Sequence, residues 1–189
     1  MRAPLHNRGP ALDTFRLAAA VLVTAIHTSP LAGVSPLADF LLTRVLARVA
    51  VPFFLMVSGY FLARRGWQGL RRFIRHNMLV YLAAAALYLP LNFYAGDSPA
   101  AWLRSFVWEG TFYHLWYFPA LLWGVLIARW LAKLGPRAGV AAAGLLYLAG
   151  LGGDSYFGLA NRVPPLSAFY ATVVRACKYT RNGLFFAPL

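Results

Sequence analysis

Three ionisable side chains lie in one apolar stretch, "LDTFRLAAAVLVTAIHTSPL", which begins at Leu12. They are Asp13, Arg16 and His27. A charged side chain at the centre of a membrane helix costs roughly 2.5–3.5 kcal/mol on insertion scales. Charges that are kept at such a cost usually mark a functional site. These three residues are therefore the first candidates for chemistry.

The spacing of the three side chains predicts that they share one helix face. Asp13, Arg16, Thr24 and His27 are separated by three, eight and three residues, which is close to whole helical turns. Asp13 can pair with Arg16 at i,i+3, and His27 stands roughly 16 Å from Arg16. A histidine in a partly dry cavity suits the removal of a proton from a hydroxyl that attacks a carbonyl. We predict Arg16 and His27 as catalytic residues, with Asp13 supporting them.

A structural interpretation of the same residues stays open. Arg16 can be an interfacial anchor whose guanidinium extends to the headgroups, and His27 can form a hydrogen bond between helices. Their common face at three-turn spacing favours the functional interpretation.

A second basic segment, "ARRGWQGLRRFIRHN", spans residues 63–77. Arg72 and Arg75 are three residues apart and would lie on one helix face. Paired guanidiniums suit phosphate binding, for example the phosphates of a nucleotide-bearing acyl donor. The alternative is an ordinary basic cytoplasmic loop.

The segment "WEGTFYHLWYFPALL" holds two further ionisable residues at the start of an apolar block. Glu109 and His114 are candidates for the acceptor side of a site. The aromatic residues around them form either an interfacial belt or the wall of that site.

Composition sets the class of protein. Of 189 residues, 60% are hydrophobic, and the mean hydropathy is +0.59. Soluble domains average about 45–50% apolar residues. The formal charge of +13 lies in flanks between apolar blocks, which favours anionic lipid headgroups over nucleic acid as the partner. Cys177 is the only cysteine, and no metal-ligand cluster is present, so we expect no internal disulfide, no metal and no bound cofactor.

Five apolar blocks are expected to form the helices that position these residues. The blocks cover residues 12–31, 45–62, 78–95, 112–132 and 138–153, and the fifth is marginal for a span of about 20 residues. We predict an all-α, multi-pass transmembrane helix bundle with about five complete helices and the start of a sixth at residue 182. It forms a single domain over residues 1–189 that is truncated at the C-terminus. A signal peptide is the alternative for residues 1–32, but Asp13 and Arg16 argue against it.

The placement of arginine and lysine predicts the orientation. With the N-terminus in the cytoplasm, the dense basic clusters at residues 64–75 and 129–137 both fall on the inner side of the plasma membrane. Four of the five acids, Asp39, Asp97, Glu109 and Asp154, fall outside. Residues 154–182 are predicted to be an outer loop with an interfacial helix that Pro164 and Pro165 open.

Taken together, these motifs resemble the acyltransferase-3 family of integral membrane O-acyltransferases. The matching segments are "ALDTFRLAAAVLVTAIH", in which ten residues separate Arg16 from His27, "VPFFLMVSGYFL", "RFIR" with Arg72 and Arg75, and "HLWYFPALL" at His114. The segments "TFYHLWYFPA" and "YTRNGLFFAPL" are similar to the membrane domain of membrane-bound serine racemases of the vancomycin-resistance type, which belongs to the same family.

The resemblance implies a bundle of about ten helices, of which this chain holds roughly the first half. It implies acyl-CoA as the cytoplasmic co-substrate and a hydroxyl-bearing, saccharide-like acceptor of the cell envelope. It implies that Arg16 and His27 are essential, with His27 the base, and that Arg72 and Arg75 contact the donor. Two alternatives remain: a domain that delivers or transports serine for a racemase, and a membrane subunit without chemistry.

Overall fold

The computed structural model describes residues 10–112, 114–153, 156–177 and 185. Every regular element in these residues is a helix, as the sequence predicts. Contacts divide the chain into two compact units, Met1–Ser58 and Gly59–Leu189, and each is described by itself.

The first unit begins with α1 (Pro10–Thr28), which is followed by a helical segment that changes its winding twice. The segment comprises α2 (Pro36–Phe40), the π-helical η1 (Leu41–Val45), the 3-10 helix η2 (Leu46–Val49) and α3 (Ala50–Arg64). α1 packs against η1 and η2. Ala19 of α1 and Ala47 of η2 are fully buried, and such small side chains let two helices approach closely.

Pro52 explains where the winding of this segment changes. Proline has no N–H, and its ring collides with the carbonyl four residues earlier, so a regular α-helix does not continue through it undisturbed. The 3-10 turn ends at Val49 and α3 begins at Ala50, which places Pro52 in the first turn of α3. Proline is tolerated there because first-turn N–H groups have no partner within the helix.

The connection between α1 and α2 is held by Asp39, which is 9% exposed. Its Oδ1 accepts a hydrogen bond from the backbone N–H of Leu31, at 3.0 Å. Ser35 caps α2 by accepting from the N–H of Ala38, and the side chain of Thr43 donates to the Asp39 carbonyl. Asp39 is therefore part of the fold of this connection.

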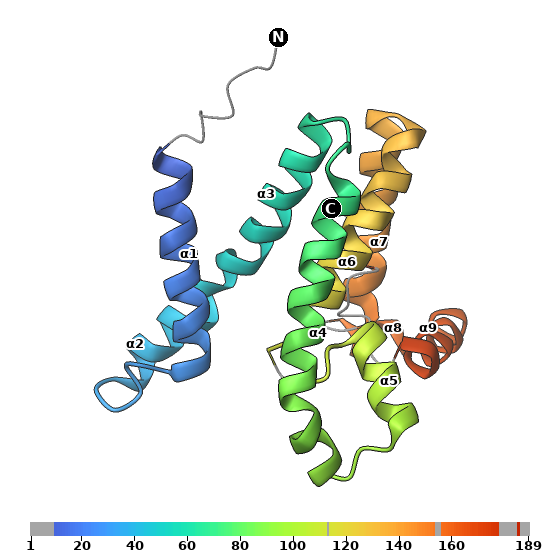
Figure 1. Cartoon of the computed structure of the whole chain (residues 1–189). Coiled ribbons are helices and arrows are strands. Elements are labelled where there is room, and N and C mark those ends of the chain that lie inside the picture. The colour runs from blue at the N-terminus through green and yellow to red at the C-terminus, as the bar shows by residue number, and fades with distance from the viewer. Residues whose placement is uncertain (1–9, 113, 154–155, 178–184, 186–189) are drawn as a thin grey trace. The chain divides into compact units, whose positions relative to one another are not determined.

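In the second unit, α4, α6 and α7 lie side by side, and α5 packs against α6 (Figure 1). The elements that follow α3 are α4 (Leu70–Tyr94), α5 (Pro99–Trp108), α6 (Tyr117–Leu131), η3 (Ala132–Leu134), α7 (Pro136–Gly153), α8 (Phe157–Ala160) and α9 (Pro164–Cys177). α9 begins at Pro164, as predicted. α5 was not predicted, although Ser98 and Pro99 carry the signal of a helix start: the Ser98 side chain accepts from the N–H of Ala101.

The core of the second unit lies along one face of α4. Buried and half-buried residues recur there at alternating spacings of four and three, which marks a single helix face. They are Ile74, Met78, Tyr81, Ala85, Tyr88 and Asn92. The Tyr81 ring stacks on that of Phe106 at 4.5 Å, and its hydroxyl donates to the Phe106 carbonyl at 2.8 Å. Leu115 and Leu122 complete the buried cluster.

Two contacts define the ends of the second unit. The guanidinium carbon of Arg129 lies 5.6 Å from the centre of the Trp67 ring. The connection between α3 and α4 therefore lies at the same end of the second unit as the last turn of α6. At the other end, the Asn92 side chain of α4 donates to the Thr111 carbonyl ahead of α6. The basic clusters at residues 64–75 and 129–137 therefore lie at the same end of the second unit, as the predicted orientation requires.

Four helices of the described chain are long and apolar enough to cross a membrane: Pro10–Thr28, Pro36–Arg64, Leu70–Tyr94 and Tyr117–Leu134. They correspond to the first four predicted blocks. The fifth block forms α7, which has 18 residues and is not among these four. The predicted start of a sixth helix, at residue 182, lies outside the described residues except for Phe185.

Candidate active site

The predicted site residues fall in both units. Asp13, Arg16 and His27 lie on α1 of the first unit. The second unit holds Arg72 and Arg75 on α4, and Glu109 and His114 between α5 and α6. The geometry of each group is given within its own unit.

On α1, the predicted pair of charges is formed. Arg16 Nη1 lies 3.3 Å from Asp13 Oδ1, with side-chain exposures of 28% and 55%. Asp13 lies in the first turn of α1, where the helix dipole stabilises a carboxylate. The pair holds the Arg16 guanidinium against the helix and offsets part of the cost of its charge.

His27 lies in the last turn of the same helix, with an exposed side chain. Because α1 is uninterrupted from Pro10 to Thr28, eleven residues place His27 roughly 16 Å from Arg16 along the axis. The Thr24 hydroxyl between them donates to the Ala20 carbonyl of its own helix at 3.1 Å. The face predicted from sequence is thus present, with Arg16 near one end and His27 near the other.

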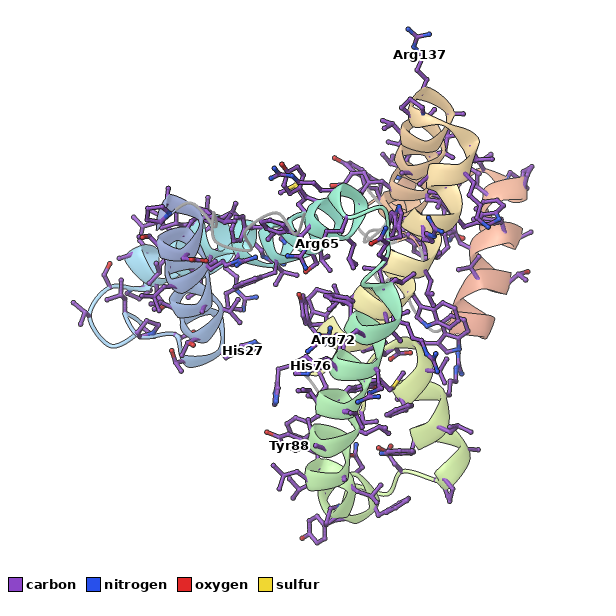
Figure 2. The ribbon with its side chains drawn as sticks, turned by 45° about the horizontal axis from the view of Figure 1, so that its top comes forward. His27, Arg65, Arg72, His76, Tyr88 and Arg137 are labelled. Atoms are coloured by element: carbon purple, nitrogen blue, oxygen red, sulfur yellow. The ribbon has the colours of Figure 1, made fainter. Side chains whose placement is uncertain are left out.

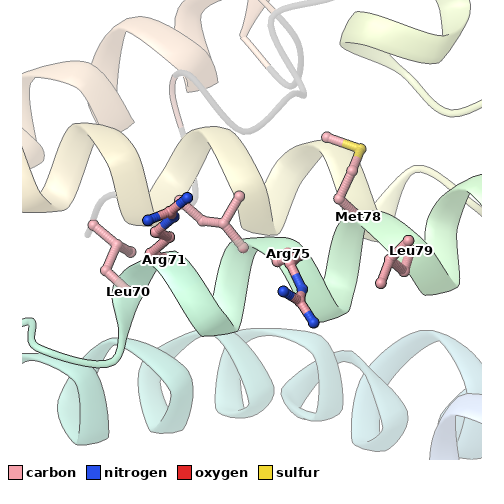
Figure 3. Close-up of a pocket in the computed structure, with 6 residues that line it drawn as sticks. Leu70, Arg71, Arg75, Met78 and Leu79 are labelled. Atoms are coloured by element: carbon pink, nitrogen blue, oxygen red, sulfur yellow. The ribbon is translucent and has the colours of Figure 1, made fainter.

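Arg72 and Arg75 both lie near the start of α4 with exposed side chains. Figure 2 shows Arg72, His76 and Tyr88 following one another along this helix. Only Arg75 of the predicted pair lines the groove at this end of α4, and its companion there is Arg71. Arg72 does not line this groove (Figure 3), and the donor-binding role of Arg72 and Arg75 stays a prediction.

The acceptor-side candidates differ in environment. Glu109 directly follows α5 as its C-cap residue, and one of its carboxylate oxygens is buried. The exposed His114 ring lies edge-on to the rings of Tyr88 and Phe112, at 5.2 and 5.6 Å. Tyr88 and Phe112 stack at 4.4 Å. The aromatic residues at this end therefore pack into a wall around His114.

A polar cluster beside this wall was not predicted from sequence. Asn92 Nδ2 donates to the Thr111 carbonyl and to Asp97 Oδ2, the latter at 3.3 Å. Asn92 is 8% exposed and Thr111 is 4% exposed. Asn92 Oδ1 and the Thr111 hydroxyl have no hydrogen-bond partner among the described residues. The sequence did hold a signal for this cluster, because an asparagine inside an apolar helix needs a hydrogen-bond partner.

Comparison with known proteins shows which family this chain matches. The sequence model of the family described as an acyltransferase domain matches residues 10–187. An amino-acid racemase of Enterococcus faecalis is 43% identical over 187 residues, covering 94% of this chain and 26% of the racemase. A serine/alanine racemase of Enterococcus gallinarum is 40% identical over 199 residues, covering 98% of this chain and 28% of the racemase. This chain thus spans about a quarter of the length of these relatives. No solved structure matches it.

Proposed function

We propose a function from one premise: the chain belongs to the acyltransferase-3 family, whose domain it matches from residue 10 to residue 187. The chain carries a membrane acyltransferase-like domain. Its proposed reaction is the transfer of an acyl group from acyl-CoA on the cytoplasmic side to a hydroxyl of an extracytoplasmic, saccharide-like acceptor. Membership of the family and the helix that carries Arg16 and His27 support this proposal.

The proposed roles follow from the chemistry of each side chain. His27 takes the proton of the acceptor hydroxyl as the hydroxyl oxygen attacks the thioester carbonyl. A carbon–oxygen bond forms, the carbon–sulfur bond breaks, and the proton passes to the departing thiolate of CoA. Arg16, held by Asp13, orients the donor, and Arg72 and Arg75 bind its phosphates. Glu109 and His114 lie on the acceptor side.

The observation that carries this proposal is the continuity of α1. One unbroken helix sets the spacing between Arg16 and His27. The ion pair with Asp13 holds the Arg16 guanidinium. A cation and an imidazole on one face supply two of the functions that acyl transfer uses: binding of an anionic donor and removal of a proton.

A second candidate function is delivery of an amino acid across the membrane to a racemase. It is favoured by the names of the curated relatives, which are amino-acid and serine/alanine racemases at 39–43% identity. This chain matches 26–28% of their length. No residue of this chain is assigned a role in racemisation.

Release of free CoA thiol from acyl-CoA tests the leading proposal. The chain, reconstituted in lipid nanodiscs with an acceptor mixture from cell envelopes, should release CoA, and His27→Ala should lower the rate by about 100-fold or more, because general bases contribute about 10²–10⁴. His76→Ala is the matched control, since His76 is an exposed histidine with no assigned role. Equal rates for the wild type and His27→Ala would refute the assignment of His27 as the base.

A further inference from the structure

We propose that α5 and α6 are the two halves of one interrupted membrane helix, and that the connection between them lines a water-filled vestibule. The connection comprises residues 109–112 and 114–116 in the described part of the chain, and is called the α5–α6 connection below. The vestibule opens at the end of α4 that carries Asn92, and it admits polar solutes without net negative charge. Its existence does not depend on acyl transfer.

α6 runs beside only the first half of α4. The Phe118 ring, at the start of α6, stacks on the Tyr81 ring near the middle of α4, with the ring centres 5.4 Å apart. Further along α6, the Arg129 guanidinium lies over the Trp67 ring, just ahead of α4. α6 is therefore antiparallel to α4, and its first turn lies beside the middle of α4.

α5 runs beside the other half of α4 (Figure 1). Ahead of α5, Asp97 Oδ2 accepts a hydrogen bond from the side chain of Asn92, in the last turn of α4, at 3.3 Å. Near the end of α5, the Phe106 ring stacks on the Tyr81 ring at 4.5 Å. α5 is therefore also antiparallel to α4, and it ends beside the residue at which α6 begins. Two helices that follow one another in the same direction along a third helix have the arrangement of an interrupted helix.

In a membrane that α4 crosses, the α5–α6 connection lies within the hydrocarbon core. The middle residue of α4 is Leu82, and Tyr88 lies six residues beyond it, roughly 9 Å along the axis. Half of the hydrocarbon core of a bilayer is about 15 Å thick. The rings of Phe112 and His114 lie 4.4 and 5.2 Å from the Tyr88 ring, so they lie at the same depth as Tyr88.

The backbone and polar atoms of the α5–α6 connection favour contact with water. Non-helical backbone at membrane depth is tolerated only where protein buries it or where it lines a water-filled cavity. The described chain does not bury this connection, because Phe112 is 39% exposed, Trp116 is 37% exposed and His114 is exposed. Asn92 Oδ1 and the Thr111 hydroxyl have no hydrogen-bond partner among the described residues. Such atoms are usually satisfied by water, which a vestibule supplies.

Local charge decides which solutes enter the vestibule. Residues 77–116 form the second half of α4, α5 and the α5–α6 connection. They hold two acids, Asp97 and Glu109, and one arginine, Arg104, in a chain whose formal charge is +13. A net negative wall disfavours anions. A hydroxyl-bearing acceptor and a zwitterionic amino acid both fit this vestibule, and the choice of the acceptor rests on the proposed function.

Labelling of two cysteines at one depth tests the vestibule. In a Cys177→Ser background, His114→Cys should react with a membrane-impermeant, cationic thiol reagent that is added to intact cells. Leu87→Cys should react at least about tenfold more slowly, because a thiol in lipid does not ionise and the reagent does not enter. Leu87 precedes Tyr88 by one residue and is 75% exposed, so it is a matched control at the same depth on the outer surface of α4.

A third cysteine supplies the reference for a thiol outside the membrane. Ala100→Cys lies in the exposed first turn of α5. The ratio of labelling by the cationic reagent to labelling by an anionic reagent should be several-fold higher at His114→Cys than at Ala100→Cys. Labelling in SDS shows that each thiol is present, and size-exclusion chromatography in detergent shows that each variant is folded.

Four results would overturn the proposal. Equally fast labelling of His114→Cys and Leu87→Cys would place the α5–α6 connection outside the membrane. No labelling of His114→Cys, with Ala100→Cys labelled, would mean that the connection is covered and dry. Labelling of His114→Cys only after the inner side is opened would place the opening at the other end. Equal charge ratios at the two exposed positions would contradict the exclusion of anions. The labelling needs no acyl-CoA, so these results are separate from the release of CoA thiol that tests acyl transfer.

Discussion

At the scale of single residues, several polar side chains of the described helices have partners on their own helix. Asp13 pairs with Arg16 one turn away, and the hydroxyls of Thr24 and Ser58 donate to carbonyls four residues earlier. Asn92 is different, because it joins α4 to the segment before α6, nineteen residues away. Local pairs lower the cost of a polar atom in an apolar helix, whereas Asn92 also fixes how two elements meet.

The link made by Asn92 yields a stability prediction. Asn92→Ala should lower the free energy of unfolding by about 1–3 kcal/mol, because it leaves the buried Thr111 carbonyl without this donor. Thermal unfolding of the chain in detergent measures the loss.

Asn77→Ala is the matched control on the same helix. Asn77 Nδ2 donates to the Phe73 carbonyl, which lies one turn earlier in α4, so its removal should cost less than about 1 kcal/mol. Losses of similar size in the two variants would contradict the role given to Asn92.

At the scale of elements, the backbone folds back closely on itself in the turn into α6. Gly110 has a φ of +86°, and a Cβ on it would overlap the backbone of Leu115 and Trp116. This close approach brings Thr111 beside Asn92 and sets the start of α6, whose N-terminal half is buried. Glycine is required here both for its backbone conformation and for its lack of a side chain.

Substitution of two glycines separates these two requirements. Gly96 also has a positive φ, +92°, but a Cβ on it would meet no atom within 4 Å. Gly96→Ala should therefore pay only the conformational cost of about 1–2 kcal/mol. Gly110→Ala should be destabilised by that conformational cost and by the overlap as well, with a clearly lower unfolding temperature and a lower yield. Equal unfolding temperatures for the two variants would show that the overlap is relieved without cost.

At the scale of the whole molecule, two units carry the candidate residues, and four helices are long and apolar enough to span a membrane. The contact of Trp67 with Arg129 joins the two basic clusters at one end of the second unit. The acids Asp97 and Glu109 belong to the opposite end, with Asn92 and Thr111. This separation of charge supports our proposal that the basic end faces the cytoplasm.

Single cysteines test that orientation. In a Cys177→Ser background, Gln68→Cys and Lys133→Cys should react with a membrane-impermeant thiol reagent only after the inner side is opened. Ala100→Cys, at the other end of the second unit, should react in intact cells. All three positions are exposed. The reverse pattern would contradict the cytoplasmic placement of the basic end of the second unit.

The sequence predicted well whatever depends on short-range pattern. Block length predicted the four helices that are long and apolar enough to span a membrane, and i,i+3 spacing predicted the pair of Asp13 with Arg16. The sequence did not predict the contact of Asn92 with Thr111, because nothing local encodes a partner nineteen residues away. The donor-binding role of Arg72 and Arg75 stays a prediction; both side chains are exposed near the start of α4.

The measurement that tests the central claim most directly follows the label of acyl-labelled acyl-CoA in vesicles that contain the chain. The account predicts that label appears as an ester on a hydroxyl-bearing acceptor outside, and that His27→Ala abolishes this product while His76→Ala does not. Labelled serine that accumulates across the same membrane without acyl-CoA, with no labelled ester formed, would contradict acyl transfer and favour amino-acid delivery.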